Sequence, residues 1–293
     1  MKTIAEIAQE IELQLTEQLN CSGIMYRLFS RVKSPFSIEN KMKHKGELYH
    51  SGKAKIADII GLRIVVYFTD DVEALALLLN NNCVVKRSVD EPDSCTFRPQ
   101  RLNLTSRIPD EYIADFRTQL PAEYAQFINE TYEIQIRTIF SEGWHEVEHD
   151  FRYKCKEDWI YYEPYSRTLN GVIATLETAE WSMQSLFQEM SRENFRHQNF
   201  TAMLRNKMRI RLKGKGLSPN LEEYLKSHQA IAEAVMNVDR VIFMLVLLKH
   251  KKHVELTYDN VLFLMNRIEI MDAELMALED EVTKKEITEM LCS

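Results

Sequence analysis

The segment YEIQIRT, residues 132–138, is the feature that most constrains the fold. Its polar and apolar side chains alternate strictly, and a period of two is the pattern of a β-strand with one buried face. The two isoleucines then pack into a core, while Glu133, Gln135 and Arg137 share the opposite face. An acid, an amide and a guanidinium on a rigid strand suit metal binding, contact with sugar hydroxyls and neutralisation of phosphate. The alternative is a polar face that is simply exposed to solvent.

The residues before this strand alternate between helical and extended patterns. Apolar side chains at helical spacing predict an amphipathic helix over residues 1–20. β-branched and aromatic residues in LRIVVYF predict a buried strand at 62–68. Ser37 is expected to cap a short helix over 38–45, because Pro35 fits a loop that enters this helix. The remaining expected elements are a helix over 70–82, strands at 83–89 and 101–109, and a helix from 141 to about 154.

From about residue 165 onward the pattern is entirely helical. Residues 169–190 have the spacing of one amphipathic helix, and two or three more helices are expected within 221–291. The change near DWIYYEPYS predicts a first domain over 1–160 and a helical region over 161–293. The predicted fold class is therefore α+β: a mixed sheet of about five strands flanked by helices, followed by an all-helical C-terminal region.

Composition restricts the class of protein. Hydrophobic residues make up 45% and charged residues 28% of the chain, which is typical of a globular protein and argues against disorder. The formal net charge is −7, so any contact with nucleic acid needs a local basic patch. The five cysteines are scattered without a CxxC pair, which indicates a reducing compartment. The N-terminus lacks the apolar core of a signal peptide, and the most apolar run is too short to span a bilayer. We therefore expect a cytoplasmic protein without membrane contact.

The segment RVKSPFSIENK places four phosphate-binding side chains around the start of a helix. These are Arg31, Lys33, Ser37 and Lys41. Backbone N–H groups at a helix N-terminus, a hydroxyl and several cations together make a cradle for polyphosphate. The alternative is a solvated basic face, because short basic patterns recur by chance.

The segment IADIIGLRIVVYF places one acid just before an apolar strand and one arginine at its entrance. Asp58 is the acid and Arg63 the arginine. A magnesium ion takes one or two carboxylates together with phosphate oxygens, so Asp58 is a candidate ligand. A guanidinium plane stacks well on a purine base, which suits Arg63. The alternative is a turn acid and a surface arginine.

The segment WHEVEHD contains a formal HExxH match. On a helix, His145 and His149 lie one turn apart and could bind zinc, with Glu146 as the general base. This pattern makes a zinc hydrolase the competing enzyme class. The motif is short and often accidental, and no third ligand stands out downstream.

A basic stretch from Arg192 to Lys215 holds eight cations and one acid, Glu193. In an acidic protein this asymmetry favours a phosphate-rich partner. A solvated helix face explains the same residues.

Over about residues 20–155, the ordered segments resemble the synthetase domain of the RelA/SpoT family, which makes the alarmone (p)ppGpp. The matching pattern is RxKxxxSIxxK, then DIxGxRI, then ExQIRT followed by a Trp, an EH pair and YK. The resemblance implies a nucleotidyltransferase-like domain that moves pyrophosphate from ATP to the 3′-hydroxyl of GTP or GDP, with Mg²⁺ as cofactor. It implies a role in the stringent response. It also accounts for WHEVEHD better than a protease does.

For the donor site, the resemblance implies that Arg31 and Arg63 sandwich the adenine of ATP. Its phosphates would be held by Lys33, Ser37 and Lys41. The magnesium ligands would be Asp58 and Glu133.

For the acceptor site, the resemblance implies that Glu133 acts as base on the 3′-hydroxyl. The residues that would line this side are Gln135, Arg137 and His149. The family's acceptor loop usually reads GYRSxH, whereas this chain has TFRPQRLNL. Phe97 would replace the stacking Tyr, Arg98 keeps the Arg, and Arg101 stands near the His position. Because the Gly and the His are absent, the acceptor stays open.

Two further functions remain open. Some small relatives are toxins that pyrophosphorylate the 3′ end of tRNA, and the Arg192–Lys215 stretch would suit that substrate. A non-catalytic nucleotide sensor would bind ATP without turnover. Residues 221–248 are apolar enough to form either a core or a homo-oligomer interface.

Overall fold

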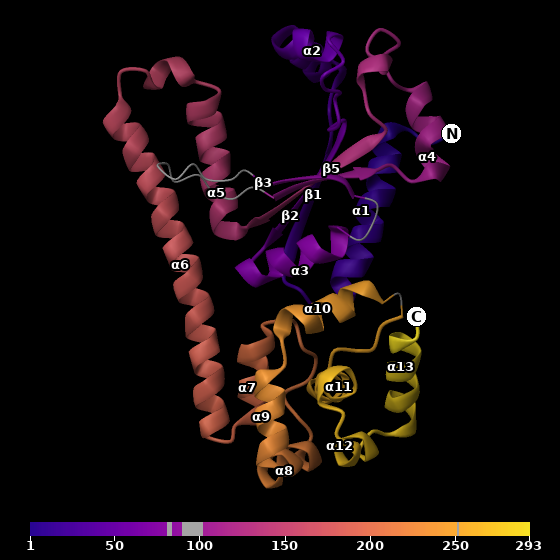
Figure 1. Cartoon of the computed structure of the whole chain (residues 1–293), viewed down its shortest axis with the longest axis vertical. Helices are drawn as coiled ribbons and strands as arrows, with labels where there is room; N and C mark the ends of the chain where they lie inside the picture. Colours follow the sequence, from indigo (N-terminus) through magenta and orange to yellow (C-terminus); the bar gives the residue numbers. More distant parts are fainter. Residues whose placement is uncertain (81–83, 90–101, 251) are drawn as a thin grey trace. The chain divides into compact units, whose positions relative to one another are not determined.

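A five-stranded mixed sheet carries the candidate site, and the computed structural model describes it within residues 1–80, 84–89, 102–250 and 252–293. The order of the strands is β1-β2-β5-β4-β3. β2 and β5 run parallel, and the other neighbouring pairs run antiparallel. The predicted α+β class is therefore confirmed (Figure 1). The strand bounds are β1 Tyr26–Val32, β2 Ile60–Val66, β3 Val84–Val89, β4 Leu102–Arg107 and β5 Thr131–Thr138.

The register of the sheet decides which side chains share a face. Gly61 of β2 lies opposite Glu133 of β5, and Arg63 lies opposite Gln135. Paired residues on neighbouring strands point to the same side of a sheet. The polar face predicted for β5 therefore continues onto β2. The other face is apolar, since Ile134 is fully buried.

The helices of the first half begin and end close to the predicted bounds. The expected helix over 1–20 is α1, Ile4–Cys21, and the helix over 70–82 is α3, Thr69–Asn80. The short helix expected over 38–45 is longer, because α2 covers Pro35–His50. Its cap is Ser34, whose hydroxyl accepts a hydrogen bond from the Ser37 amide, so the cap predicted at Ser37 is wrong. Proline is favoured at the first helical position, which explains the earlier start.

Short helical elements lie on both sides of strand β5 in the sequence. Helix α4, Asp110–Thr118, and a 3₁₀ turn, η1 Ala125–Phe127, precede the strand. Helix α5, Ile139–Glu148, follows it, and a π-helical turn, η2 His149–Tyr153, continues α5. The 3₁₀ turn η3, Lys156–Trp159, then closes this part of the chain.

The second half is helical but more divided than predicted. Among the described residues, six α-helices and the π-helical turn η4 begin between residues 219 and 281, instead of the expected two or three helices. Capping side chains start several of them separately, among them Asp239, Thr257 and Asp272. The bounds are α6 Glu163–Arg196, α7 Phe200–Met208, α8 Pro219–Ser227, α9 Gln229–Asn237, α10 Arg240–Lys249, α11 Tyr258–Met265, η4 Asn266–Ile270, α12 Ala273–Ala277 and α13 Glu281–Leu291.

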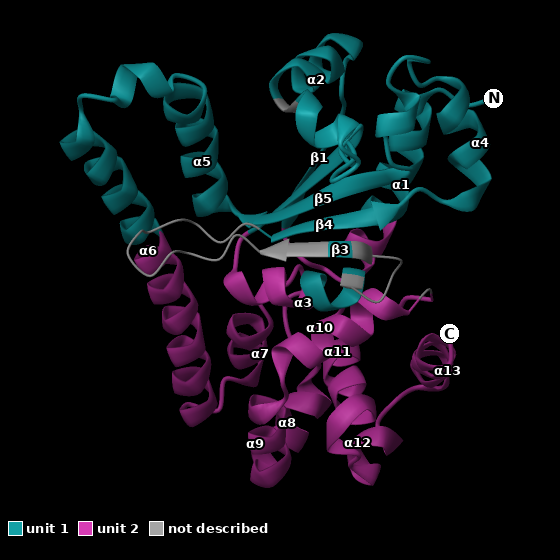
Figure 2. Cartoon of the chain, turned by 45° about the horizontal axis from the view of Figure 1, so that its top comes forward, with its two compact units in different colours: residues 1–16, 26–66, 75–176 teal, residues 17–25, 67–74, 177–293 magenta. Residues whose placement is uncertain are grey.

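The chain divides into two units, each made of several segments (Figure 2). Unit 1 consists of Met1–Thr16, Tyr26–Val66 and Leu75–Leu176. Unit 2 consists of Glu17–Met25, Tyr67–Ala74 and Glu177–Ser293. The boundary near residue 160 stays a prediction.

The apolar segment 221–248 contributes to a core. Leu225, Val235, Phe243 and Leu248 are each fully buried within the chain. A homo-oligomer through this region stays a prediction. In the part of the chain that the structure describes, no helix combines the length and the apolarity needed to cross a membrane.

Candidate active site

Asp58 and two lysines form the first part of the site. The ammonium of Lys33, just after β1, lies 2.7 Å from Oδ2 of Asp58. The ammonium of Lys41, on α2, lies 2.8 Å from Oδ1 and 2.9 Å from Oδ2. The backbone fixes this corner as well, since the Lys33 amide donates to the carbonyl of Ile59 at 2.8 Å. The structure thus brings together two predicted phosphate ligands and one predicted metal ligand.

The charges at this corner are strongly coupled. Burial raises the pKa of the Asp58 carboxyl, but the hydrogen bonds from Lys33 and Lys41 outweigh burial and hold this pKa below its ordinary value. Burial also lowers the pKa of Lys33, and Asp58 offsets this only in part. Two cations share one carboxylate here. The arrangement therefore favours the charged form of Asp58, whereas the charged form of Lys33 remains disfavoured.

A chain of hydrogen bonds runs along the polar face of β5 and β2. The Gln135 amide nitrogen donates to Oε1 of Glu133 at 2.9 Å. The Gln135 oxygen accepts from Nη2 of Arg137 at 3.0 Å and from Nε of Arg63 at 3.3 Å. Gln135 therefore orients an acid and two guanidinium groups at once. This face is organised and is not a generic solvent-exposed surface.

Two glutamates of α5 complete this chain, and neither of them belongs to the motifs that predict the nucleotide site. Arg63 is paired with Glu142 and with Glu146. Glu142 also lies 3.7 Å from Nε of Arg137. The side chain of Glu142 is 13% exposed and that of Glu146 is 57% exposed. Their spacing of four residues on a helix that follows β5 is the sequence signal that could have identified them.

Gly61 is a further residue of the site that was not among the predicted site residues. A Cβ atom at this position would lie 3.5 Å from Nε and 3.6 Å from Cγ of Arg31, so the Arg31 side chain lies over this glycine. Arg31 is opposite Gly61 in the β1–β2 register, and Gly61 is opposite Glu133. The exposed Arg31 guanidinium thus shares the sheet face that carries Glu133.

Ser37 lies in the first turn of α2 and is exposed. Its hydroxyl lies 2.9 Å from that of Ser34. Pro35 has no N–H group and the Ser37 amide is bonded to the Ser34 hydroxyl, so the two hydroxyls are the groups of this turn that suit an anion.

The HExxH segment is split between two environments. His145 is 3% exposed, whereas the His149 side chain is 51% exposed. The His149 ring stacks on Tyr153 and contacts Asp150 at 3.0 Å. Within residues 1–80, 84–89, 102–250 and 252–293, no group of three His, Cys, Asp or Glu side chains could hold a metal ion. A zinc site of the protease type therefore has no structural support.

Three predicted acceptor residues, Phe97, Arg98 and Arg101, lie outside the described residues. Of the other acceptor residues, Gln135 and Arg137 belong to the hydrogen-bonded chain on the sheet. His149 belongs to the π-helical turn after α5 and is not part of that chain.

The basic stretch from Arg192 to Lys215 is partly internal to unit 2. Arg209 is buried and paired with Asp70. Lys207 donates to the carbonyl of Met236 at 2.6 Å, and burial lowers its pKa to about 8. Fewer cations are therefore available on the surface than the sequence suggests. A tRNA contact through this stretch stays a prediction.

The carboxylates fit a hard cation with one condition. Asp58 and Glu133 supply the oxygen ligands that Mg²⁺ prefers. Both oxygens of Asp58 are engaged by the lysines, whereas no donor among the described residues contacts Oε2 of Glu133. Magnesium binding by Asp58 and Glu133 stays a prediction, and it requires the lysines to turn from Asp58 to the phosphates of a bound nucleotide.

Residues 30–158 match the family described as "Region found in RelA / SpoT proteins". The matched range includes Lys33, Lys41, Asp58 and the whole polar face of β5. The resemblance predicted from the ordered motifs of this segment is therefore confirmed by the match over these residues.

One curated relative and two solved structures give the measure of this similarity. The GTP pyrophosphokinase YwaC of Bacillus subtilis (strain 168) is 32% identical over 142 residues, which cover 44% of this chain and 59% of the relative. The small alarmone synthetase 1 of Bacillus subtilis is 21% identical, with a TM-score of 0.45 over 62% of this chain and 91% of that one. A GTP pyrophosphokinase family protein from Streptococcus pneumoniae is also 21% identical, with a TM-score of 0.45 over 62% and 88% of the two chains.

Proposed function

We propose that residues 30–158 form an ATP-dependent pyrophosphokinase that acts on the 3′-hydroxyl of GTP or GDP. The observation that carries the proposal is the hydrogen-bonded chain in which Gln135 links Glu133 to Arg63 and Arg137. The match of this segment to the RelA/SpoT region supports the same assignment. The curated relative YwaC is named a GTP pyrophosphokinase, which is consistent with this assignment.

The donor half would bind ATP by an exchange of ion pairs. Lys33 and Lys41 are both paired with Asp58. Polyphosphate carries more negative charge than one carboxylate, so it would draw both ammonium groups from Asp58. The hydroxyl of Ser37 in the first turn of α2 would contact the same phosphates. Arg31 and Arg63 would pack against the adenine.

Catalysis of this reaction depends on alignment of the two substrates and on neutralisation of the phosphate charge more than on covalent catalysis. The acceptor 3′-oxygen attacks the β-phosphorus of ATP, the bond from this phosphorus to the α–β bridging oxygen breaks, and AMP leaves. Glu133 would take the proton of the 3′-hydroxyl. A magnesium ion held by Asp58 and Glu133 would supply neutralisation of the phosphate charge.

The acceptor half would use the rest of the β5 face. Gln135 keeps Glu133 and Arg137 in fixed positions, and Arg137 is a buried guanidinium suited to an acceptor phosphate. His149 would line the acceptor side from the π-helical turn η2, where its side chain is exposed. Such turns are frequent at functional sites.

The test is a transfer assay with several acceptors. The protein is incubated with Mg²⁺ and with ATP labelled in its γ-phosphate, together with GTP, GDP or total tRNA in separate reactions. The proposal expects label in guanosine tetra- or pentaphosphate, and strongly reduced label in the Glu133→Gln variant. Label on tRNA alone would assign the toxin activity instead, and ATP binding without any transfer would leave only a nucleotide sensor.

A further inference from the structure

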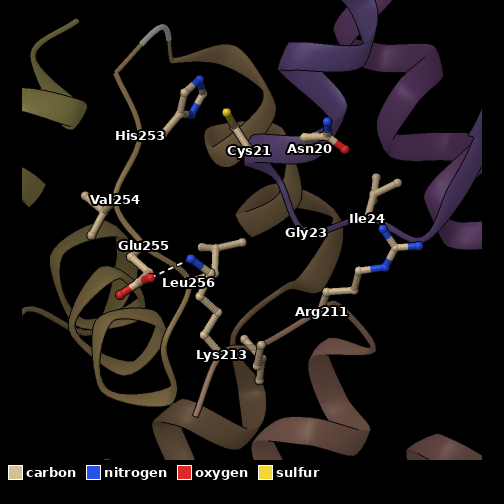
Figure 3. Close-up of a pocket in the computed structure, with 11 residues that line it drawn as sticks. Asn20, Cys21, Gly23, Ile24, Arg211, Lys213, His253, Val254, Glu255 and Leu256 are labelled. Carbon is tan, nitrogen blue, oxygen red and sulfur yellow. Dashed lines mark hydrogen bonds and ion pairs between the residues drawn. The ribbon is translucent and has the colours of Figure 1, made fainter.

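Unit 2 contains a cavity that has no part in the proposed pyrophosphate transfer. Its volume is about 370 Å³, which lies within the range of small-molecule sites. Residues at the end of α1 and in the following turn, 20–24, form one wall; the segments 211–213 and 253–256 form the others (Figure 3). All of them lie outside residues 30–158, so the RelA/SpoT region does not account for this cavity.

Backbone hydrogen bonds fix the walls of the cavity relative to one another. The Arg211 amide donates to the Gly23 carbonyl at 2.8 Å, and the Lys213 amide donates to the Leu256 carbonyl at 2.8 Å. Gly23 has a φ of +69°, and a Cβ atom there would lie only 2.8 Å from Cδ1 of Leu256. Only glycine fits this close approach without strain. The cavity is therefore preformed, which reduces the entropic cost of binding.

The charged side chains of the cavity leave one positive charge without a partner. Lys213 is neutralised by Glu255, with 2.6 Å between Nζ and Oε1. Arg211 is exposed and forms no ion pair within the part of the chain that the structure describes. Burial, and then the neighbouring His250, lower the pKa of His253, which favours the neutral form of its ring. A net positive cavity in a protein of net charge −7 selects for an anion.

Apolar side chains make up much of the remaining lining. Ile24, Leu212, Val254 and Leu256 all line the cavity. In Figure 3 the Arg211 guanidinium and the Lys213–Glu255 pair lie on opposite sides of Leu256. An apolar surface beside a cation fits a ligand that has an apolar body and one charged group.

We infer that this cavity binds a small organic anion, with its carboxylate, phosphate or sulfonate on Arg211 and its apolar body against Ile24, Val254 and Leu256. A guanidinium binds such groups through paired hydrogen bonds, which fixes the orientation of the ligand. The inference does not depend on the proposed pyrophosphate transfer.

The first test uses Cys21, which lines the cavity, as a reporter of occupancy. The full chain is alkylated with iodoacetamide, and the rate at Cys21 is followed by peptide mass spectrometry. The probe is 8-anilinonaphthalene-1-sulfonate, and its control is N-phenyl-1-naphthylamine, which has the same apolar body without the sulfonate. We expect the sulfonate to slow alkylation of Cys21 and the amine to leave it unchanged. Cys155, which does not line the cavity, reports general effects.

Two variants change the charge of the cavity in opposite directions. Arg211→Gln should weaken binding of the sulfonate about tenfold, the effect of losing one charge-assisted contact. Glu255→Gln frees Lys213 and should tighten binding severalfold. Arg192→Gln is the control, because Arg192 is an exposed arginine paired with Glu189 and does not line the cavity.

The combined pattern decides the outcome. Protection of Cys21 that is lost in Arg211→Gln and strengthened in Glu255→Gln supports an anion site. Equal alkylation with and without the sulfonate overturns the inference. Protection that is the same for the amine, or the same in Arg211→Gln, also overturns it, because binding would then be apolar only. Thermal unfolding of each variant verifies that the fold is kept.

Discussion

Asp58 holds Lys33 and Lys41 at the same time, with the Lys33 ammonium 2.7 Å from Oδ2 and the Lys41 ammonium 2.8 Å from Oδ1. The sequence predicted these residues as separate ligands of magnesium and of phosphate. The structure shows them as one charge cluster. A bound nucleotide must therefore compete with Asp58 for both lysines.

This competition gives Asp58→Asn two effects of opposite sign. Without magnesium, the variant should bind ATP more tightly than the wild type, by about three- to tenfold, because the competing carboxylate is gone. With magnesium, its turnover should fall by about a hundredfold, because a metal ligand is lost. Isothermal titration without magnesium and a turnover assay with it measure the two effects. Weaker ATP binding in the variant would contradict the exchange of ion pairs.

The same carboxylate predicts a dependence of stability on pH. The lysines hold the pKa of Asp58 below its ordinary value of 3.8. Its contribution to the free energy of unfolding is therefore fully present above the unfolded pKa, and is lost as the pH falls through the folded pKa. Urea unfolding at pH 7 and at pH 3 should show a smaller loss of stability in Asp58→Asn than in the wild type. An equal loss in both proteins would show that the pairing does not stabilise the fold.

Glu142 is predicted to be a positioning residue for two arginines of the site. It contacts Arg63 and lies 3.7 Å from Nε of Arg137. Glu142→Gln should reduce kcat/KM for ATP about tenfold or more, because both guanidinium groups lose a fixed anionic partner. Glu146→Gln is the matched control, since Glu146 contacts Arg63 but is 57% exposed.

Steady-state kinetics and unfolding separate positioning from general stability. The Glu142 effect should persist at temperatures well below the unfolding transition, and Glu142→Asp should restore part of it. If Glu146→Gln lowered kcat/KM as much as Glu142→Gln, the Glu142 carboxylate, which lies near both arginines, would not be the positioning element.

Unit 2 contains a buried charge cluster whose removal should destabilise the chain. Asp71 is fully buried, and its Oδ1 atom lies 2.6 Å from Nη2 of Arg240. Arg240→Met leaves this carboxylate without its cation and should cost about 3–5 kcal/mol in the free energy of unfolding. Arg196→Met, at an exposed arginine of α6, should cost less than about 1 kcal/mol. Urea denaturation measures both, and equal costs would contradict the role of the cluster.

The sequence patterns predicted β5 and β2 well because alternation and β-branched residues within each segment are sufficient to indicate a strand. Strict alternation in residues 132–138 matches β5, and the β-branched run at 62–68 matches β2 within two residues. The parallel pairing of β2 with β5 depends on contacts far apart in the chain, so the alternation alone did not reveal that Arg63 lies opposite Gln135.

The errors have local physical causes. Ser34 and Ser37 are both suitable N-cap residues. Because proline is favoured at the first helical position, the helix begins at Pro35 and Ser34 becomes the cap. In the C-terminal region, apolar spacing continues across residues that cap separate short helices, so periodicity alone merged them. Glu142 was missed because its role depends on α5 packing beside the sheet, where it contacts Arg63.

The most direct test of the pyrophosphate transfer is the stoichiometry of AMP to transferred pyrophosphate with GTP as acceptor. The wild type with magnesium should form AMP and 3′-pyrophosphorylated nucleotide in equal amounts. Glu133→Gln should lower both rates by about 10²–10⁴-fold, since it removes the base and a metal ligand together. Formation of ADP and free phosphate in place of AMP, or undiminished transfer by Glu133→Gln, would contradict the assignment.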